Sequence, residues 1–396
     1  MSESRSFQGS RSVFNFTINI NAVHQPEPPS FDRLYVFGDS LSDNGNEFIG
    51  LNYVQENIDP HVEIDAPAPP YFPGRESNGL VWTDYLAQDL GLDLTPVLEL
   101  ADGAPVREND EGAYDIATSF GGNTATHSVN FAFSGARLAA DDSEPGDLVT
   151  PSVSSQVDLL LDDLATENLS VSEEGLYVVQ GGANDYLSGD YDDPTEPVAS
   201  IAEAITDLYD AGARYFLVPN LADIGNTPIG RDLSEETSRF LSDLSGRHND
   251  LLETTLRKLE RDLSGISIES PDFRALTLDV ANDPTAFGLT NGTDAYLVGE
   301  SPDFTITGDD PDDYFYWDYI HPTTVGQELL ADIALEDTLN LNADCSELMS
   351  EALQLILGSF NGSGSELDQA NTLDTIQLTD QVRYPQMLAG IVESLN

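Results

Sequence analysis

The chain has 396 residues and a formal net charge of −56, because 71 acidic side chains outnumber 15 basic ones. Its length is sufficient for a substantial buried core, in one large domain or in two ordinary ones. A surface this negative repels nucleic acid phosphates and anionic membranes, which argues against both as partners. No apolar run approaches the roughly 18 residues that a transmembrane helix requires.

The basic residues are skewed as well, since Lys258 is the only lysine. Self-repulsion at this charge density destabilises a compact state at low ionic strength, and dissolved salt screens it. We therefore expect a halophilic protein, adapted to high salt, with an acidic protein that is merely very soluble as the alternative. Residues 1–10 lack the continuous apolar core of a secretory signal, which leaves a cytoplasmic location or export by a non-classical route open.

Short apolar runs and helical patterns alternate along most of the chain. Residues 1–30 are polar and proline-rich at their end, and they predict a flexible N-terminal arm. Residues 31–340 predict one α/β domain, and residues 341–396 predict a C-terminal extension that is partly helical. Five strands are expected, at Leu34–Phe37, Val129–Phe133, Leu176–Val179, Tyr215–Val218 and Ile266–Ile268. Because these strands are short, apolar and separated by helices, we expect a three-layer α/β/α fold around a central five-stranded parallel sheet.

Two details of the expected helices bear on the histidines. Leucines at helical spacing predict one long helix that includes Leu241–Leu263, and His248 falls on its apolar face. We expect His248 to be a hydrogen-bonded packing residue. Thr324 and Gln327 form a capping-box pattern, so a second helix is expected to begin just after His321.

Polar clusters follow the first three strands, at the strand ends where active sites of parallel sheets gather. Gly38–Ser40 follows the first strand, near the start of a helix whose N–H groups can stabilise negative charge. Asn130–Ala136 ends the second strand, and Gly135 lets a ligand approach the backbone closely. In Gly181–Asp185, after the third strand, Asn184 can direct a side-chain N–H at an oxyanion. Read alone, each cluster is at least as typical of a turn or a helix cap.

The fourth cluster, Trp317–Pro322, contains Asp318 and His321. A histidine that takes a proton from a serine needs an acceptor on its other ring nitrogen, which fixes the tautomer. Asp318, three residues earlier in a tight turn, can supply that acceptor locally.

Together and in this order, the clusters resemble the sequence blocks of the GDSL family of lipases and esterases, also called SGNH hydrolases. The matching blocks are Tyr35–Asn46, Asn130–Ala136, Gly182–Asp185 and Asp318–His321. Three further stretches resemble the larger subgroup shared by plant enzymes and bacterial lecithinase- or haemolysin-like esterases: Ser77–Leu86, Ser155–Asp158 and Val218–Pro228. The resemblance covers roughly residues 31–335 and implies the flavodoxin-like SGNH hydrolase fold.

The resemblance also implies roles for individual residues in a two-step acyl transfer. Ser40 is expected to be the nucleophile, His321 the general base, and Asp318 the residue that orients His321. The oxyanion hole is expected to consist of the backbone amides of Ser40 and Gly135 and the side chain of Asn184. No metal or cofactor is implied.

These roles predict a serine hydrolase that cleaves carboxylic esters, a lipase or esterase whose substrate is a small-molecule or lipid ester. Two alternatives stay open: a carbohydrate O-acetyl esterase, and a catalytically silent binding module on the same fold. The complete set of expected site residues argues against the silent module. The sequence does not indicate an oligomeric state.

Overall fold

The computed structural model describes residues 30–62, 69–142, 145–299, 303–339 and 341. These residues fall within a compact unit formed by residues 28–343. The predicted N-terminal arm (1–30) and C-terminal extension (341–396) lie outside the described residues, apart from Ser30 and Leu341. Among the described helices, none combines the length and the apolar character that crossing a membrane requires.

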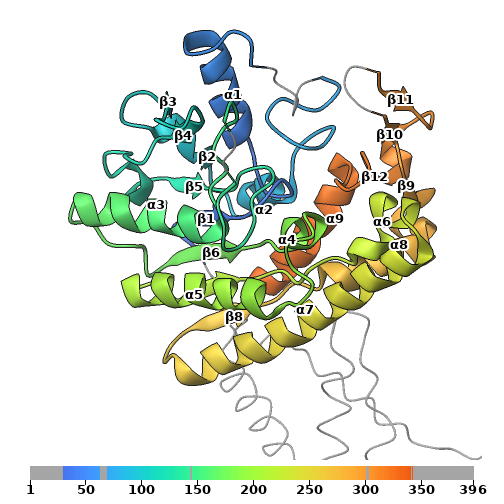
Figure 1. The fold of residues 1–396 in the computed structure, drawn as a ribbon. Helices are drawn as coiled ribbons and strands as arrows, with labels where there is room; N and C mark the ends of the chain where they lie inside the picture. Colours follow the sequence, from blue (N-terminus) through green and yellow to red (C-terminus); the bar gives the residue numbers. More distant parts are fainter. Residues whose placement is uncertain (1–29, 63–68, 143–144, 300–302, 340, 342–396) are drawn as a thin grey trace, which may run out of the picture. The chain divides into compact units, whose positions relative to one another are not determined.

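A six-stranded parallel sheet forms the centre of this unit (Figure 1). Its strands are, in spatial order, β2 (Leu94–Pro96), β5 (Ser128–Asn130), β1 (Arg33–Phe37), β6 (Gly175–Val179), β7 (Tyr215–Leu217) and β8 (Ser267–Glu269). All five neighbouring pairs run parallel. The predicted parallel sheet is therefore confirmed, but it has six strands rather than five.

The strand missing from the prediction is β2. It has three residues, ends in Pro96 and forms one edge of the sheet. Proline has no N–H to donate to a neighbouring strand, so within sheets it is confined to edges and strand ends. A three-residue run that ends in proline shows no strand pattern in the sequence, which is why β2 was missed.

The strand order reverses its direction at one point of the sheet. Without β2, the order β5-β1-β6-β7-β8 is 2-1-3-4-5 in chain order, as in flavodoxin-like folds. The chain leaves β1 toward β5 on one side and later returns to β6 on the other side. Ligands of such sheets bind beyond the carboxyl ends of the two strands at this reversal. Here those ends lead into Gly38 and Gln180, whose backbone N–H donates to Phe37 O at 3.0 Å.

Helices cover both faces of the sheet, which confirms the three-layer architecture. The side chains of β1 alternate: Tyr35 and Phe37 face one layer and Leu34 and Val36 the other, and all four are fully buried. The first layer contains α3 (Val153–Thr166), α5 (Thr195–Ala211) and α7 (Glu235–Asp262). The second layer contains α2 (Trp82–Asp89), α8 (Phe273–Asn282) and α9 (Thr324–Thr338).

The remaining helices and strand pairs lie outside the central sheet. Three further helices are α1 (Asn46–Asn57), α4 (Ala183–Leu187) and α6 (Pro228–Asp232). Three small strand pairs are β3 (Val106–Glu108) with β4 (Tyr114–Ile116), β9 (Asn291–Ala295) with β12 (Tyr314–Tyr316), and β10 (Leu297–Val298) with β11 (Thr305–Ile306).

The start of α9 differs by one residue from the predicted capping box. The N-cap is Thr323, whose Oγ1 accepts the Gly326 N–H at 3.1 Å. Thr324 instead lies 2.8 Å from the Tyr85 hydroxyl, and Gln327 accepts the Trp82 backbone N–H at 3.1 Å. Thr324 and Gln327, which the sequence pattern assigns to capping, therefore form hydrogen bonds with α2 instead.

His248 lies on the buried face of α7, as predicted. It is 1% exposed, and its Nδ1 lies 2.7 Å from the Tyr186 hydroxyl. Burial lowers the pKa of His248 to about 4, so the ring is neutral at physiological pH. Its expected role as a hydrogen-bonded packing residue is confirmed.

Candidate active site

Ser40 lies in a single helical turn directly after β1. The backbone N–H groups of Ser42 and Asp43 both donate to Asp39 O at 3.0 Å, and α1 begins only at Asn46. The Asp39 carboxylate fixes this turn from both sides, because it accepts the Leu41 N–H and the Gln180 Nε2–H at 3.0 Å each. Burial raises the pKa of Asp39 above its ordinary value.

Asp43 joins the serine turn to the loop after β5. One carboxylate oxygen accepts the N–H groups of Gly45 at 2.8 Å and Asn46 at 2.7 Å, which caps the start of α1. The other oxygen accepts the Ser134 N–H at 3.1 Å. Burial raises the pKa of Asp43 to about 6, although four backbone N–H groups oppose this shift.

The structure brings Ser40, His321 and Asp318 into one hydrogen-bonded line, although Ser40 and His321 are 281 positions apart in the chain. Ser40 Oγ lies 2.8 Å from His321 Nε2. His321 Nδ1 lies 2.9 Å from Asp318 Oδ2 and 3.1 Å from Oδ1. Asp318 Oδ1 also accepts the backbone N–H groups of Ile320 and His321, each at 2.8 Å. Acid and base are therefore held in one short turn.

The charges around His321 favour its protonated form. Burial alone lowers the pKa of an imidazole, but the negative charges of Asp318, Glu76 and Asp39 outweigh burial and raise the pKa of His321 to about 9. Burial acts on Asp318 in the opposite direction, yet the charge and hydrogen bonds of His321 hold the pKa of Asp318 below its ordinary value. A serine proton transferred to His321 would thus be well stabilised.

The three N–H donors that the sequence assigns to the oxyanion hole differ in their hydrogen bonds. Among the described residues, no protein acceptor is found for the backbone N–H groups of Ser40 and Gly135. Gly135 has a φ of +76°, and a Cβ added there would meet nothing within 4 Å. Asn184 lies at the start of α4, and its Nδ2 donates one hydrogen to Ala136 O at 3.0 Å. An amide group carries two N–H hydrogens, and this bond uses one of them.

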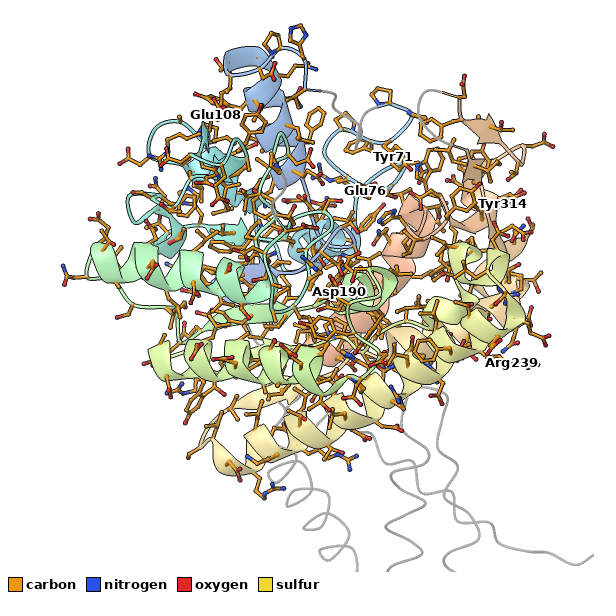
Figure 2. The ribbon with its side chains drawn as sticks, in the orientation of Figure 1. Tyr71, Glu76, Glu108, Asp190, Arg239 and Tyr314 are labelled. Carbon is orange, nitrogen blue, oxygen red and sulfur yellow. The ribbon has the colours of Figure 1, made fainter. Side chains whose placement is uncertain are left out.

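Two residues beside His321 were not predicted from the sequence. Tyr71 donates its hydroxyl hydrogen to Asp318 Oδ2 at 2.8 Å, and Glu76 Oε2 lies 3.9 Å from His321 Nδ1. Both belong to the loop between α1 and α2 and are labelled in Figure 2. Glu76 directly precedes the Ser77–Leu86 stretch, but a single acidic residue in an irregular loop of so acidic a chain carries no distinguishing signal.

Glu76, Asp318 and His321 are also the one group of acidic, histidine and cysteine side chains, in the part of the chain described, that could share a metal ion. One ligand atom from each lies within 4.8 Å of the others. Asp318 and the Nδ1 of His321 are already joined by hydrogen bonds, as given above. A cation at this place would have to replace the proton that Nδ1 shares with Asp318.

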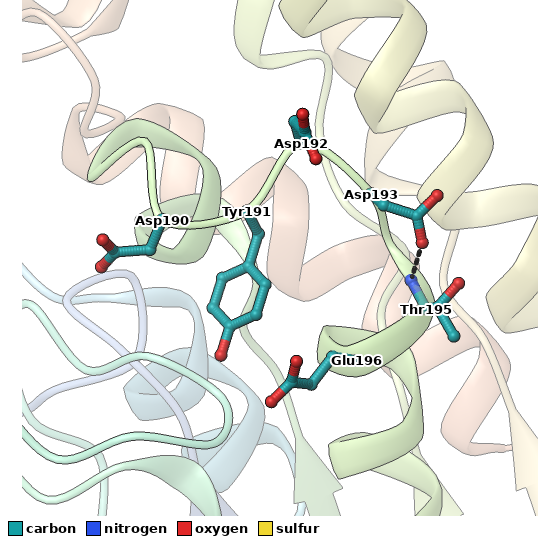
Figure 3. Close-up of a pocket in the computed structure, with 6 residues that line it drawn as sticks. All are labelled: Asp190, Tyr191, Asp192, Asp193, Thr195 and Glu196. Carbon is teal, nitrogen blue, oxygen red and sulfur yellow. Dashed lines mark hydrogen bonds between the residues drawn. The ribbon is translucent and has the colours of Figure 1, made fainter.

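A separate cavity of about 240 Å³ lies in the loop between α4 and α5 (Figure 3). Its lining residues are Asp190, Tyr191, Asp192, Asp193, Thr195 and Glu196. The Asp193 carboxylate accepts the Thr195 N–H at 3.0 Å, as the dashed line in Figure 3 marks. This acidic cavity includes none of the site residues that the sequence predicted.

The chain from residue 34 to residue 334 matches the family model described as GDSL-like Lipase/Acylhydrolase. The chain belongs to this family. All five residues expected to form the site of a GDSL hydrolase fall within the matched range: Ser40, Gly135, Asn184, Asp318 and His321.

Relatives of this GDSL protein come from plants and bacteria. It is 26% identical over 363 residues to a GDSL esterase/lipase of Arabidopsis thaliana, covering 80% of this chain and 91% of the relative. It is 29% identical over 321 residues to an uncharacterized protein of Pseudomonas putida, covering 78% of this chain and 48% of the relative. This chain thus spans about half the length of the bacterial relative.

A third relative is named inactive. It is the inactive GDSL esterase/lipase-like protein 25 of Arabidopsis thaliana, 27% identical over 256 residues, covering 61% of this chain and 54% of the relative. Membership of the GDSL family therefore does not by itself make a chain an active hydrolase, and activity must be argued from this chain's own residues.

Proposed function

We propose that this GDSL protein is a serine hydrolase that cleaves carboxylic esters through an acyl-enzyme. The observation that supports this function best is the unbroken line from Ser40 Oγ to His321 Nε2 at 2.8 Å and from His321 Nδ1 to Asp318 at 2.9 Å. A nucleophile in contact with a base, and a base oriented by a carboxylate, is the arrangement that activates a serine hydroxyl.

The first half of the reaction acylates Ser40. As Oγ bonds to the ester carbonyl carbon, its proton passes to His321 Nε2, and the carbonyl oxygen becomes an oxyanion. The amides of Ser40 and Gly135 and the Asn184 side chain donate to this oxyanion. When the bond to the alcohol breaks, the imidazolium returns the proton to the leaving oxygen. The second half repeats these steps with water as nucleophile, and it releases the acid and restores Ser40.

A buried aromatic cluster lies beside the base, and the exposed ring of Phe72 next to it supports an ester with an apolar portion. Trp317, which precedes Asp318, stacks on Tyr296 with ring centroids 5.5 Å apart, and Tyr71 packs edge-on against Trp317 at 6.0 Å. Nearby, Phe72 is 40% exposed. Apolar rings next to a polar reaction centre are typical of sites that bind small organic ligands.

The test is hydrolysis of chromogenic esters of increasing acyl length, in dilute buffer and in molar salt. We expect turnover by the wild type, and Ser40→Ala should lower it by roughly 10⁴-fold or more. Circular dichroism should show that the variant keeps its fold. Activity confined to acetyl groups on sugars would favour a carbohydrate esterase. An inert wild type under all conditions would favour a binding module.

A further inference from the structure

Glu76 is a second carboxylate at the imidazole for which the proposed mechanism has no use. It is 8% exposed, and its Oε2 lies 3.9 Å from His321 Nδ1. The position of Asp318 already satisfies the Nδ1–H, so Glu76 is not needed to fix the tautomer. Burying an additional carboxyl group costs free energy unless neighbouring groups stabilise it.

The partner of Glu76 connects it to the oxyanion hole. Ser134 donates its hydroxyl hydrogen to Glu76 Oε1 at 3.0 Å, and its backbone N–H donates to Asp43 Oδ2 at 3.1 Å. Ser134 immediately precedes Gly135, whose amide is one of the proposed oxyanion donors. Glu76 Oε1 thus accepts a hydrogen bond from Ser134, the residue before Gly135, while Glu76 Oε2 lies near His321.

We propose that Glu76 is a positioning residue that stabilises the imidazolium of His321 and couples its location to the Ser134–Gly135 loop. The inference rests on the proposed function, because it assigns His321 to proton transfer from Ser40. Charge develops on the imidazole and on the substrate oxygen in the same step. Because Glu76 contacts both Ser134 and His321, its carboxylate holds the base and the neighbouring oxyanion donor in fixed positions as these charges form.

The other groups that face His321 come from four elements of the fold. Asp318 binds Nδ1 from the same turn, Asp39 approaches from the end of β1, and Tyr71 reaches Asp318 from the loop that carries Glu76. Glu47 lies on α1, where burial first, and then Glu76 and Asp43, raise its pKa well above the ordinary value. The negative charges that raise the pKa of His321 are those of Asp318, Glu76 and Asp39.

The proposal predicts a specific change in the pH profile. Glu76→Gln keeps an oxygen that can accept the Ser134 hydrogen bond but removes the negative charge. The neutral imidazole is then favoured, so the midpoint of the acid limb of kcat/KM moves down by roughly one pH unit. The plateau falls by roughly tenfold, since one pH unit corresponds to a tenfold loss of imidazolium stabilisation. If Glu76 had a purely structural role, Glu76→Gln would lower the plateau of kcat/KM and leave the midpoint of its acid limb unchanged.

Two companion variants sharpen the test. Glu108→Gln removes the same charge from β3, which Figure 2 shows well away from Glu76, and should leave limb and plateau unchanged. Ser134→Ala removes the hydrogen bond to Glu76 but keeps the charge of Glu76. It should move the midpoint of the acid limb of kcat/KM in the same direction, by less than Glu76→Gln does. If Glu76→Gln does not fold, the test is the acid limb of kcat/KM in Ser134→Ala. A midpoint unchanged from that of the wild type overturns the proposal.

A second readout separates this inference from the proposed function. A fluorophosphonate forms a bond between Ser40 Oγ and phosphorus, releases fluoride and needs His321 to take the serine proton. The pH dependence of its labelling rate should shift in Glu76→Gln as kcat/KM does. A wild type that is labelled at Ser40 but hydrolyses no ester would refute the function and leave Glu76 testable. Identical labelling profiles for Glu76→Gln and Glu108→Gln would refute the role of Glu76.

Discussion

At the scale of single residues, the surroundings of His321 determine how the protein should respond to pH. Only the neutral imidazole can accept the proton of Ser40, and three carboxylates favour the charged ring. A raised pKa means that the ring stays charged to higher pH than a free histidine, whose pKa is about 6.5.

We therefore expect kcat/KM for a neutral ester to rise with pH up to a midpoint of about 9. The measurement is a series of initial rates at low substrate concentration from pH 5 to 10.5, corrected for spontaneous hydrolysis. The fold should be checked by circular dichroism at both ends of the range. A midpoint near the ordinary histidine value of about 6.5 would contradict the dominance of the three carboxylates over burial.

The residues of the site differ in how far they could be predicted from the sequence. Ser40, Gly135, Asn184 and the Asp318–His321 pair follow strand ends or form a local turn, and the structure joins Ser40, His321 and Asp318 by hydrogen bonds. Tyr71 and Glu76 come from an irregular loop, where neither period nor turn chemistry marks a functional position. Their contacts depend on the path of that loop over Asp318, which only the folded chain shows.

At the scale of elements, strand prediction succeeded where a strand is buried on both faces. β1 and β6 read as continuous apolar runs because helices cover them from both sides. β2 lies at the edge and ends in Pro96, so it lacks that pattern. The position of the α9 cap could not be decided from two adjacent threonines, because tertiary contacts with α2 select between them.

The α9 cap gives a test at this scale. Thr323 is fully buried, accepts the Gly326 N–H and donates to Tyr314 O at 2.7 Å. Thr323→Ala should lower the free energy of unfolding by about 1–2 kcal/mol, because the cap and a buried acceptor lose their partner. Urea denaturation followed by circular dichroism measures this.

A matched control is Thr254→Ala, on the exposed surface of α7. This change removes no cap and replaces threonine by a better helix former, so stability should stay the same or rise slightly. Equal losses in Thr323→Ala and Thr254→Ala would mean that Thr323 does not act as the cap of α9.

At the scale of the whole molecule, the net charge of −56 sets the response to salt. The surface of α3 and α5 shows the effect locally. Partial burial, followed by repulsion from Asp162 and Asp207, raises the pKa of Asp158. Burial and the charges of Glu203 and Asp210 raise the pKa of Asp207. Carboxylates on this face therefore repel one another in the folded state.

We propose on this basis that the protein is adapted to high salt, and we expect its Tm to rise as sodium chloride increases from 10 mM to 2 M. The Debye length falls from about 30 Å at 0.01 M to about 3 Å at 1 M, which removes most of the repulsion between surface carboxylates. Thermal unfolding followed by circular dichroism measures the change. Sucrose at matched osmolality serves as the uncharged control. A Tm that is insensitive to salt, or that rises equally in sucrose, would show that charge screening is not the cause.

The wide separation of Ser40 and His321 along the chain has a consequence for biosynthesis. Ser40, the proposed nucleophile, leaves the ribosome with the first strand of the domain, whereas Asp318 and His321 emerge together, just ahead of the last described helix. A nascent or truncated chain that ends before Asp318 carries a serine without its activating imidazole. On the proposed function, hydrolytic competence therefore requires that the segment carrying Asp318 and His321 has folded against the turn that carries Ser40.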